Sequence, residues 1–213
     1  MSAERRFSQR RFHLEESLTQ NGGARTVFIE HMTPGTTVPP HYHLCFAETF
    51  DLLEGSITVY SSAQAPTAAG DEGADLDLLG RSSQKLRPRR APGEAEAEAE
   101  AAPTVPPGTY HKYVVGDADT VLRVVVAPGH ADFERLLMVL DGLAEDGELE
   151  SMGDSMLLMA VIMDLGDAHL LGPAKAMLDG VYASQRQEVE DLKARLLNKY
   201  DNEESLKKLL AKD

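Results

Sequence analysis

One run of spaced residues constrains the fold more than any other feature of the chain. Its order is Gly35, five residues, His41, one residue, His43, four residues, Glu48, six residues and Gly55. Two histidines that lie two positions apart on a strand project from the same face. Glycine reaches positive φ without a Cβ penalty, so the flanking glycines are expected in turns. The pattern predicts an extended segment that presents two imidazoles to one side.

Glu48 has the opposite parity to the two histidines, so a straight strand would aim its carboxylate away from them. The segment 44–47 is therefore expected to turn or bulge and to place Glu48 on the next strand, facing the same cavity. Phe50 and Leu52 share the parity of Glu48. They would make that cavity partly apolar, which suits a substrate with a hydrophobic body and an oxygen-bearing head.

A second stretch, from Pro106 to Gly108 and on to His111, is expected to form a tight turn that aims a third imidazole at the start of a strand. Three imidazoles and one carboxylate are typical of a site for one divalent transition metal, with Fe(II), Mn(II), Ni(II) and Zn(II) all compatible. At octahedral geometry, four protein ligands leave two positions for a substrate or for dioxygen plus substrate.

The region between these motifs reads as antiparallel β structure. Strands are expected where β-branched and aromatic residues concentrate between Gly and Pro turns, at 25–32, 49–53, 56–60 and 121–126. Residues 61–103 interrupt them with a low-complexity insertion that we expect to be mobile. Two further strands are expected there, around Asp75–Leu79 and just before Val105.

After Gly129 the pattern becomes helical. Asp132 is expected to cap a first helix, and a second at 154–165 is apolar almost all round, which predicts burial between other elements or in a subunit interface. A third helix is expected from about 173 to 200 and a last one after Asn202. The predicted organisation is an N-terminal segment (1–24), a β-barrel (25–130) and an α-helical extension (131–213).

Charge and composition exclude several classes of protein. The 35 acidic and 21 basic side chains give a net charge of −14, which disfavours nucleic-acid binding. The longest apolar run, 156–163, is far shorter than the roughly 18 residues of a membrane span. Cys45 is the single cysteine and is expected to be a small buried hydrophobe. Without disulfides and without the apolar core of a secretory signal, a cytoplasmic protein is expected.

The two motifs resemble those of the cupin superfamily. The segment Gly35–Gly55 matches the first cupin signature, and the Pro-x-Gly-x-x-His core of the second ends at His111, although Val115 stands where cupins often have asparagine. The resemblance covers about residues 25–127 and implies a jelly-roll β-barrel with metal in its lumen. The chain is most similar in element order to single-barrel, cupin-2-like proteins with helices after the barrel.

Cupins include dioxygenases, isomerases, decarboxylases, lyases and non-catalytic binders, so the fold does not name the reaction. We favour a metal-dependent, dioxygenase-like enzyme that holds Fe(II) through His41, His43, Glu48 and His111 and acts on a small oxygenated organic molecule. Tyr113 shares the parity of His111 and is the best candidate for moving protons, whereas Tyr42 is expected to point outward. The alternative is a non-catalytic barrel that binds metal or a small ligand, with a helical dimerisation or partner surface. A homodimer is what the resemblance implies.

Overall fold

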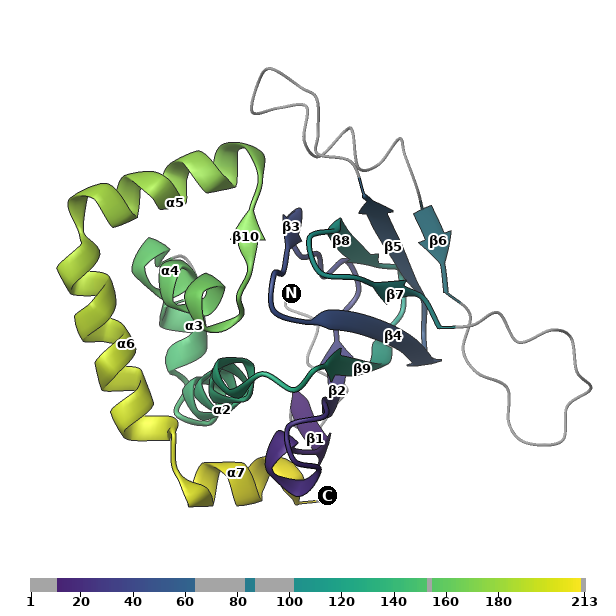
Figure 1. The fold of residues 1–213 in the computed structure, drawn as a ribbon, viewed down its shortest axis with the longest axis horizontal. Helices are drawn as coiled ribbons and strands as arrows, with labels where there is room; N and C mark the ends of the chain where they lie inside the picture. The colour runs from purple at the N-terminus through teal and green to yellow at the C-terminus, as the bar shows by residue number, and fades with distance from the viewer. Residues whose placement is uncertain (1–10, 64–82, 87–101, 153–154, 212–213) are drawn as a thin grey trace, which may run out of the picture.

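The fold is built from two antiparallel five-stranded sheets followed by helices (Figure 1). It is a computed structural model that describes residues 11–63, 83–86, 102–152 and 155–211. One sheet has the order β1-β2-β9-β4-β7 and the other β10-β3-β8-β5-β6. The strands are β1 (Phe12–Glu16), β2 (Thr26–Met32), β3 (His41–Tyr42), β4 (Ala47–Glu54), β5 (Ile57–Ser62), β6 (Ser83–Lys85), β7 (Thr104–Val105), β8 (Tyr110–Val115), β9 (Thr120–Ala127) and β10 (His169–Leu170).

The two sheets enclose a core because alternate residues of their strands are apolar. On β4, Glu48, Phe50 and Leu52 are buried while their neighbours are more exposed. Gly55, at φ 85°, makes the turn between β4 and β5. The hairpin that Glu54 and Gly55 predict is wrong, because β4 pairs with β7 and β9 in one sheet and β5 pairs with β6 and β8 in the other. The predicted jelly-roll barrel followed by a helical extension is confirmed.

The edges of the sheets differ from the sequence-based expectation. The sequence analysis assigns no strand before Arg25, but β1 lies there and pairs with β2. The strand expected just before Val105 is β7, which pairs with β4. The strand expected around Asp75–Leu79 lies outside the described residues, as does most of the insertion 61–103. At the edge of the second sheet, the short strand β6 pairs with β5.

The helices follow β9 directly. They are α2 (Ala131–Glu145), α3 (Glu148–Met152), α4 (Met156–Leu165), α5 (Gly172–Ser184), α6 (Arg186–Tyr200) and α7 (Glu203–Leu210). The prediction that Asp132 caps the first helix is wrong: His130 is the N-cap and its Nδ1 accepts from the Phe133 amide, while Asp132 pairs with Arg135. The single helix expected over 173–200 is also wrong, because the chain bends at Gln185 and forms α5 and α6.

The bend at Gln185 has a packing reason. Both α5 and α6 pack against α4, and Figure 1 shows them wrapping around it from different directions. Four α4 side chains are buried in this helical core: Leu158, Ala160, Val161 and Leu165. The apolar α4 is therefore covered by elements of its own chain, one of the two environments that its sequence predicts. No helix in the described ranges is both long enough and apolar enough to cross a bilayer.

Helix α2 joins the barrel to the helices. Phe133 and Leu137 belong to the barrel core, whereas Val139 and Leu143 belong to the helical core. The buried Glu134 adds a polar clamp to the N-terminal segment. Its carboxylate accepts from Ser17 Oγ (2.8 Å), from the Leu18 amide (2.6 Å) and from Thr26 Oγ1 (2.6 Å).

Candidate metal centre

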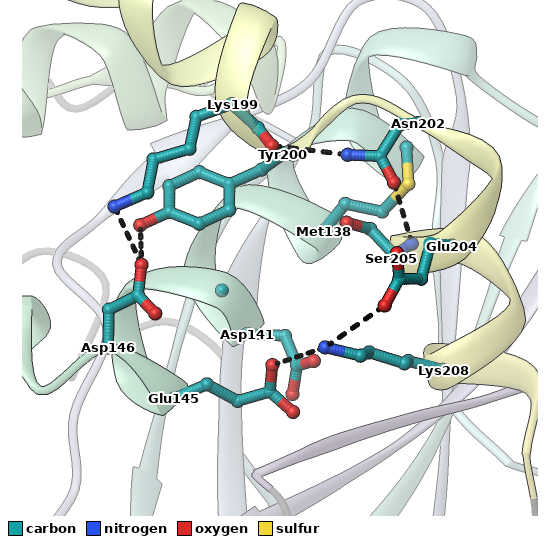
Figure 2. Close-up of a pocket in the computed structure, with 11 residues that line it drawn as sticks. Met138, Asp141, Glu145, Asp146, Lys199, Tyr200, Asn202, Glu204, Ser205 and Lys208 are labelled. Carbon is teal, nitrogen blue, oxygen red and sulfur yellow. Dashed lines mark hydrogen bonds and ion pairs between the residues drawn. The ribbon is translucent and has the colours of Figure 1, made fainter.

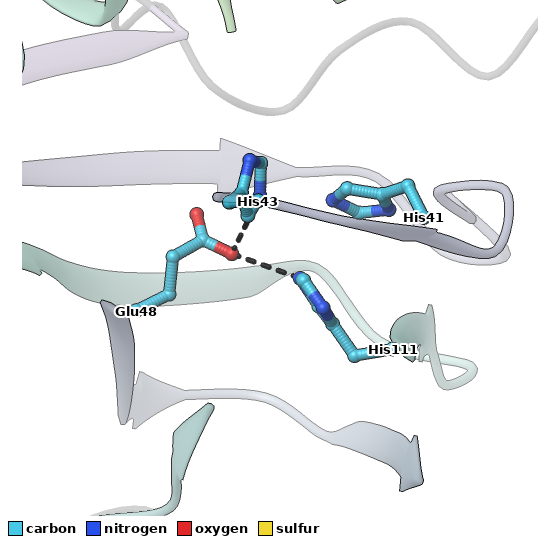
Figure 3. A group of neighbouring side chains, drawn as sticks. All are labelled: His41, His43, Glu48 and His111. Carbon is cyan, nitrogen blue, oxygen red and sulfur yellow. Dashed lines mark hydrogen bonds and ion pairs between the residues drawn. The ribbon is translucent and has the colours of Figure 1, made fainter. Parts of the chain in front are cut away.

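Four buried side chains converge between the two sheets (Figure 3). His41 lies on β3 and His111 directly opposite on β8, both in one sheet. Glu48 comes from β4 in the other sheet, and His43 lies in the connection between β3 and β4. All four are at most 7% exposed. The turn predicted between His43 and Glu48 is present, so the carboxylate faces the imidazoles despite its parity.

The distances within this group match a small coordination sphere. Glu48 Oε2 lies 3.0 Å from His111 Nε2 and 3.2 Å from His43 Nε2. One ligand atom from each of the four residues lies within 4.8 Å of every other. An ion at about 2.1 Å from each ligand separates opposite ligands by about 4.2 Å, so the group needs to contract by less than about 1 Å. These residues could hold a metal ion.

Backbone carbonyls fix the orientation of all three imidazoles. Each Nδ1 lies within hydrogen-bond distance of a carbonyl oxygen: His41 with Pro39 (2.8 Å), His111 with Thr109 (3.0 Å), and His43 with Gly166 (3.0 Å) and Asp167 (3.1 Å). A carbonyl only accepts, so Nδ1 carries the proton and the neutral ring has its lone pair on Nε2. This arrangement is the usual one for metal-binding histidine.

The Nε2 atom of His43 supplies the test of whether a metal suits this site. It is buried and, in the described part of the chain, makes no well-directed hydrogen bond, although Glu48 Oε2 lies 3.2 Å away. Burying a nitrogen without a hydrogen-bond partner costs free energy of folding, unless a bound metal ion accepts the lone pair of that nitrogen. The donor set of three imidazoles and one carboxylate therefore fits a divalent transition metal.

Charge and burial shift the pKa values of the group in different directions. Burial, together with the neighbouring His111 and His43, lowers the pKa of His41 to about 3. Burial also opposes ionisation of His43 and Glu48, but their mutual attraction outweighs it. The pKa of His43 is raised, and the pKa of Glu48 lies well below its usual value. At neutral pH the group therefore holds an anionic carboxylate and a neutral His41.

Tyr113 lies on β8, two residues after His111, and its side chain is buried. Its ring packs on Phe50, and its phenol donates to Glu30 Oε2 at 3.3 Å. Glu30 is itself held by Arg11 at 2.9 Å. Burial and the Glu30 charge raise the pKa of Tyr113 well above 10, so the phenol keeps its proton at neutral pH. Phe50 and Leu52 line the same buried region, as their parity predicts.

Three other residues of the first motif face away from the group. Cys45 is exposed, so the prediction of a small buried hydrophobe is wrong. The turn after His43 directs both Leu44 and Cys45 to solvent. Tyr42 points away from the four residues, as predicted, and stacks on His169 with 4.9 Å between ring centroids.

The sequence analysis missed the contribution of the corner between α4 and β10. Gly166 and Asp167 supply the carbonyl acceptors of His43, more than 120 residues along the chain. No motif surrounds these two positions in the sequence.

A pocket lies apart from this group, between α2, α6 and α7 (Figure 2). Its charged side chains pair with one another, such as Lys199 with Asp146 and Lys208 with Glu145. We assign it no role.

Comparisons with known proteins add fold-level similarities. No family model matches the chain, and no curated protein matches it. Among solved structures, KdgF from Halomonas sp. is 15% identical over 57% of this chain and 80% of its own length, with a TM-score of 0.39. An uncharacterised Klebsiella pneumoniae protein with a double-stranded β-helix domain is 18% identical over 61% and 84%, with a TM-score of 0.36. L-ribose isomerase from Cellulomonas parahominis is 16% identical over 49% and 50%, with a TM-score of 0.36.

The class of the protein follows from its own topology and site. Two five-stranded antiparallel sheets enclose a barrel, and residues of the two motifs that resemble cupin signatures meet in one buried group. The chain has a cupin-type jelly-roll β-barrel fold with a C-terminal helical extension. Its buried group of three histidines and one glutamate could hold a metal ion.

Proposed function

We propose that the protein binds one divalent transition metal through His41, His43, Glu48 and His111 and is a dioxygenase-like enzyme that acts on a small oxygenated organic molecule. Fe(II) is the preferred metal, with Mn, Ni and Zn as the other members of the class. The observation that supports this most directly is the orientation of the imidazoles. Every Nδ1 faces a backbone carbonyl, which leaves Nε2 of each ring available as a ligand atom, and one ligand atom from each of the four residues lies within 4.8 Å of the others.

The residues of the site have separate roles in this proposal. The bound metal would supply Lewis acidity or oxygen activation. Glu48 contributes the negative charge that offsets part of the charge of a divalent ion. Phe50 and Leu52 provide an apolar wall and exclude water from the lumen side. Tyr113 is the proposed catalytic residue: it holds a proton on its phenol oxygen, and Glu30 and Arg11 set the direction of that O–H.

Metal content, measured by mass spectrometry on untagged protein, tests the binding step. We expect about one equivalent of Fe, Mn, Ni or Zn in the wild type and loss of that metal in His41→Ala and Glu48→Ala. His13→Ala is the matched control, since His13 lies on β1 outside the group, and it should keep its metal. A wild type that is isolated without metal and takes up none when it is added would refute the proposal.

Turnover is tested separately from binding. The Fe(II)-loaded protein should consume oxygen with one class among phenolic, flavonoid, thiol and keto-acid substrates, and Tyr113→Phe should lower kcat by about 10²-fold or more while it keeps the metal. Isomerase and lyase reactions are assayed in parallel with the other three metals. A protein that binds about one equivalent of metal but shows no turnover in the oxidation, isomerase or lyase assays would favour the alternative, a non-catalytic binding barrel.

That alternative includes a helical dimerisation or partner surface. A homodimer is also compatible with the enzyme proposal, and sedimentation equilibrium of the full chain measures it directly. A monomer at all concentrations would refute the dimer without affecting the metal site.

A further inference from the structure

We propose that Asp167 is a positioning residue for His43, so that the helical extension and not the barrel alone aims one of the metal ligands. This inference rests on the proposed metal binding. Asp167 lies at the corner between α4 and β10, where the chain returns from the helical core to the rim of the barrel. Its backbone and its carboxylate both contact the segment that carries His43.

The three imidazoles differ in where their carbonyl acceptors come from. His41 and His111 each use the carbonyl two residues earlier in the chain, at Pro39 and Thr109. Such contacts are local and form whenever the strand forms. His43 instead uses the carbonyls of Gly166 and Asp167, at 3.0 and 3.1 Å. Its orientation therefore depends on the docking of a distant segment.

The carboxylate of Asp167 holds the backbone that follows His43. Its Oδ2 atom accepts from the amides of Leu44 at 2.7 Å and Cys45 at 2.6 Å. Hydrogen bonds to a charged acceptor are about twice as strong as those between neutral groups. The two bonds fix the turn that carries the chain from β3 to β4 and so fix the direction from which the His43 ring enters the site.

The corner itself is held in an uncommon backbone conformation. Asp167 has φ 47°, and it is the sole non-glycine residue with positive φ among the residues that the structure describes. Such a conformation costs free energy and persists where the surroundings fix it. Before Asp167 in the chain, Leu165 is fully buried. After it, β10 pairs with β3, and the Leu171 amide donates to the Pro40 carbonyl oxygen at 3.1 Å. The carbonyls of the corner thus face His43 from a fixed position.

The variant Asp167→Gly tests the effect of the carboxylate separately from the effect of backbone strain. Glycine adopts positive φ freely, so this change removes the two amide contacts without adding strain. Asp167→Asn is the conservative variant, because its amide oxygen still accepts and asparagine tolerates positive φ. Asp164→Ala is the matched control. Asp164 lies three residues earlier and is exposed, and its carboxylate pairs with Lys193 of α6.

The test is Co(II) titration of the full-length, metal-free proteins followed by visible absorption, with unfolding in urea measured on the same samples. We expect Asp167→Gly to bind Co(II) about 10-fold to 100-fold more weakly and with an altered ligand-field spectrum, as for loss of a residue that orients a ligand. Asp167→Asn should recover most of the affinity, and Asp164→Ala should match the wild type. Wild-type affinity and spectrum in Asp167→Gly would overturn the proposal, even if that variant were less stable.

A second measurement does not depend on metal. In NMR spectra of the metal-free proteins, Asp167→Gly should shift the ring resonances of His43 more than those of His41 and His111. These two rings pack on the His43 ring, at centroid distances of 4.8 and 5.3 Å, but take their carbonyl acceptors elsewhere. Equal shifts in all three rings would indicate a general loss of structure and overturn the positioning role. If the wild type binds no Co(II), the proposed function fails, and the ring resonances alone decide whether Asp167 places His43.

Discussion

The unusual protonation of His41 makes the stability of the metal-free protein depend on pH in a way that can be calculated. The folded pKa is about 3, against about 6.5 for an exposed histidine, because the ring is buried beside two other imidazoles. Below pH 6.5 the unfolded chain binds a proton that the folded protein does not bind, so stability falls as pH falls. From pH 6.5 to 5.0 the loss is about 2 kcal/mol, because each pH unit costs about 1.4 kcal/mol once the unfolded histidine is charged.

His43 contributes with the opposite sign but in a different pH window. Its folded pKa is raised, so it stabilises the protein as pH falls toward 6.5, and its contribution is complete below that value. Glu48, whose folded pKa is depressed, loses its contribution only as pH falls below its usual range near 4.5. The window from pH 6.5 to 5.0 therefore isolates His41.

The assay is urea unfolding of chelator-treated protein at pH 6.5 and pH 5.0. His41→Gln removes the titrating group, so its free energy of unfolding should fall by about 2 kcal/mol less than that of the wild type between the two pH values. Tyr42→Phe, on the same strand, is the control and should follow the wild type, because it leaves His41 in place. Equal pH dependence in His41→Gln and the wild type would refute the protonation assigned to this group.

Two further predictions concern the fold. Glu134→Ala leaves three donors, two of them buried, without their carboxylate acceptor and should lower the free energy of unfolding by about 3–5 kcal/mol. Glu134→Gln keeps one acceptor oxygen and should lose less, and equal urea midpoints for Glu134→Ala and the wild type would contradict the clamp. At Gly55, a Cβ would lie 2.4 Å from the Asp119 carbonyl oxygen, so Gly55→Ala should cost about 2–4 kcal/mol in the same assay. Gly35→Ala, at φ 76° with open space around it, should cost about 1 kcal/mol, and equal losses at both glycines would show that the contact has no effect.

Those features that depend on local periodicity could be predicted from the sequence. Strand alternation places Glu48, Phe50 and Leu52 on one face, and the turn before His111 aims its ring, because both effects act over a few residues. The exposure of Cys45 could not be inferred in the same way. The need for a turn was evident from the parity of Glu48, but which residues that turn would expose depends on how it docks against the corner at Asp167.

Helix boundaries failed for a related reason. His130 and Asp132 both precede an apolar helical stripe at capping distance, and the sequence does not distinguish a helix that begins at Ala131 from one that begins two residues later. At Gln185 no Pro or Gly marks the break between α5 and α6. The break depends on the path around α4, which is a property of the packed structure and not of the local sequence.

The side chains of the candidate metal centre are oriented by two different parts of the chain. His41 and His111 use carbonyls two residues earlier, just before their own strands, whereas His43 uses carbonyls at the end of α4, which is held in place by the helical core. A barrel cut after residue 130 would keep all four candidate ligands but would lose the acceptors of His43 together with strand β10 and the α2 side chains that pack in the barrel core. Weaker metal binding by such a truncated barrel would therefore not by itself show that the barrel misfolds. Because point substitutions at Asp167 leave the helical core intact, they separate the orientation of one ligand from the stability of the fold.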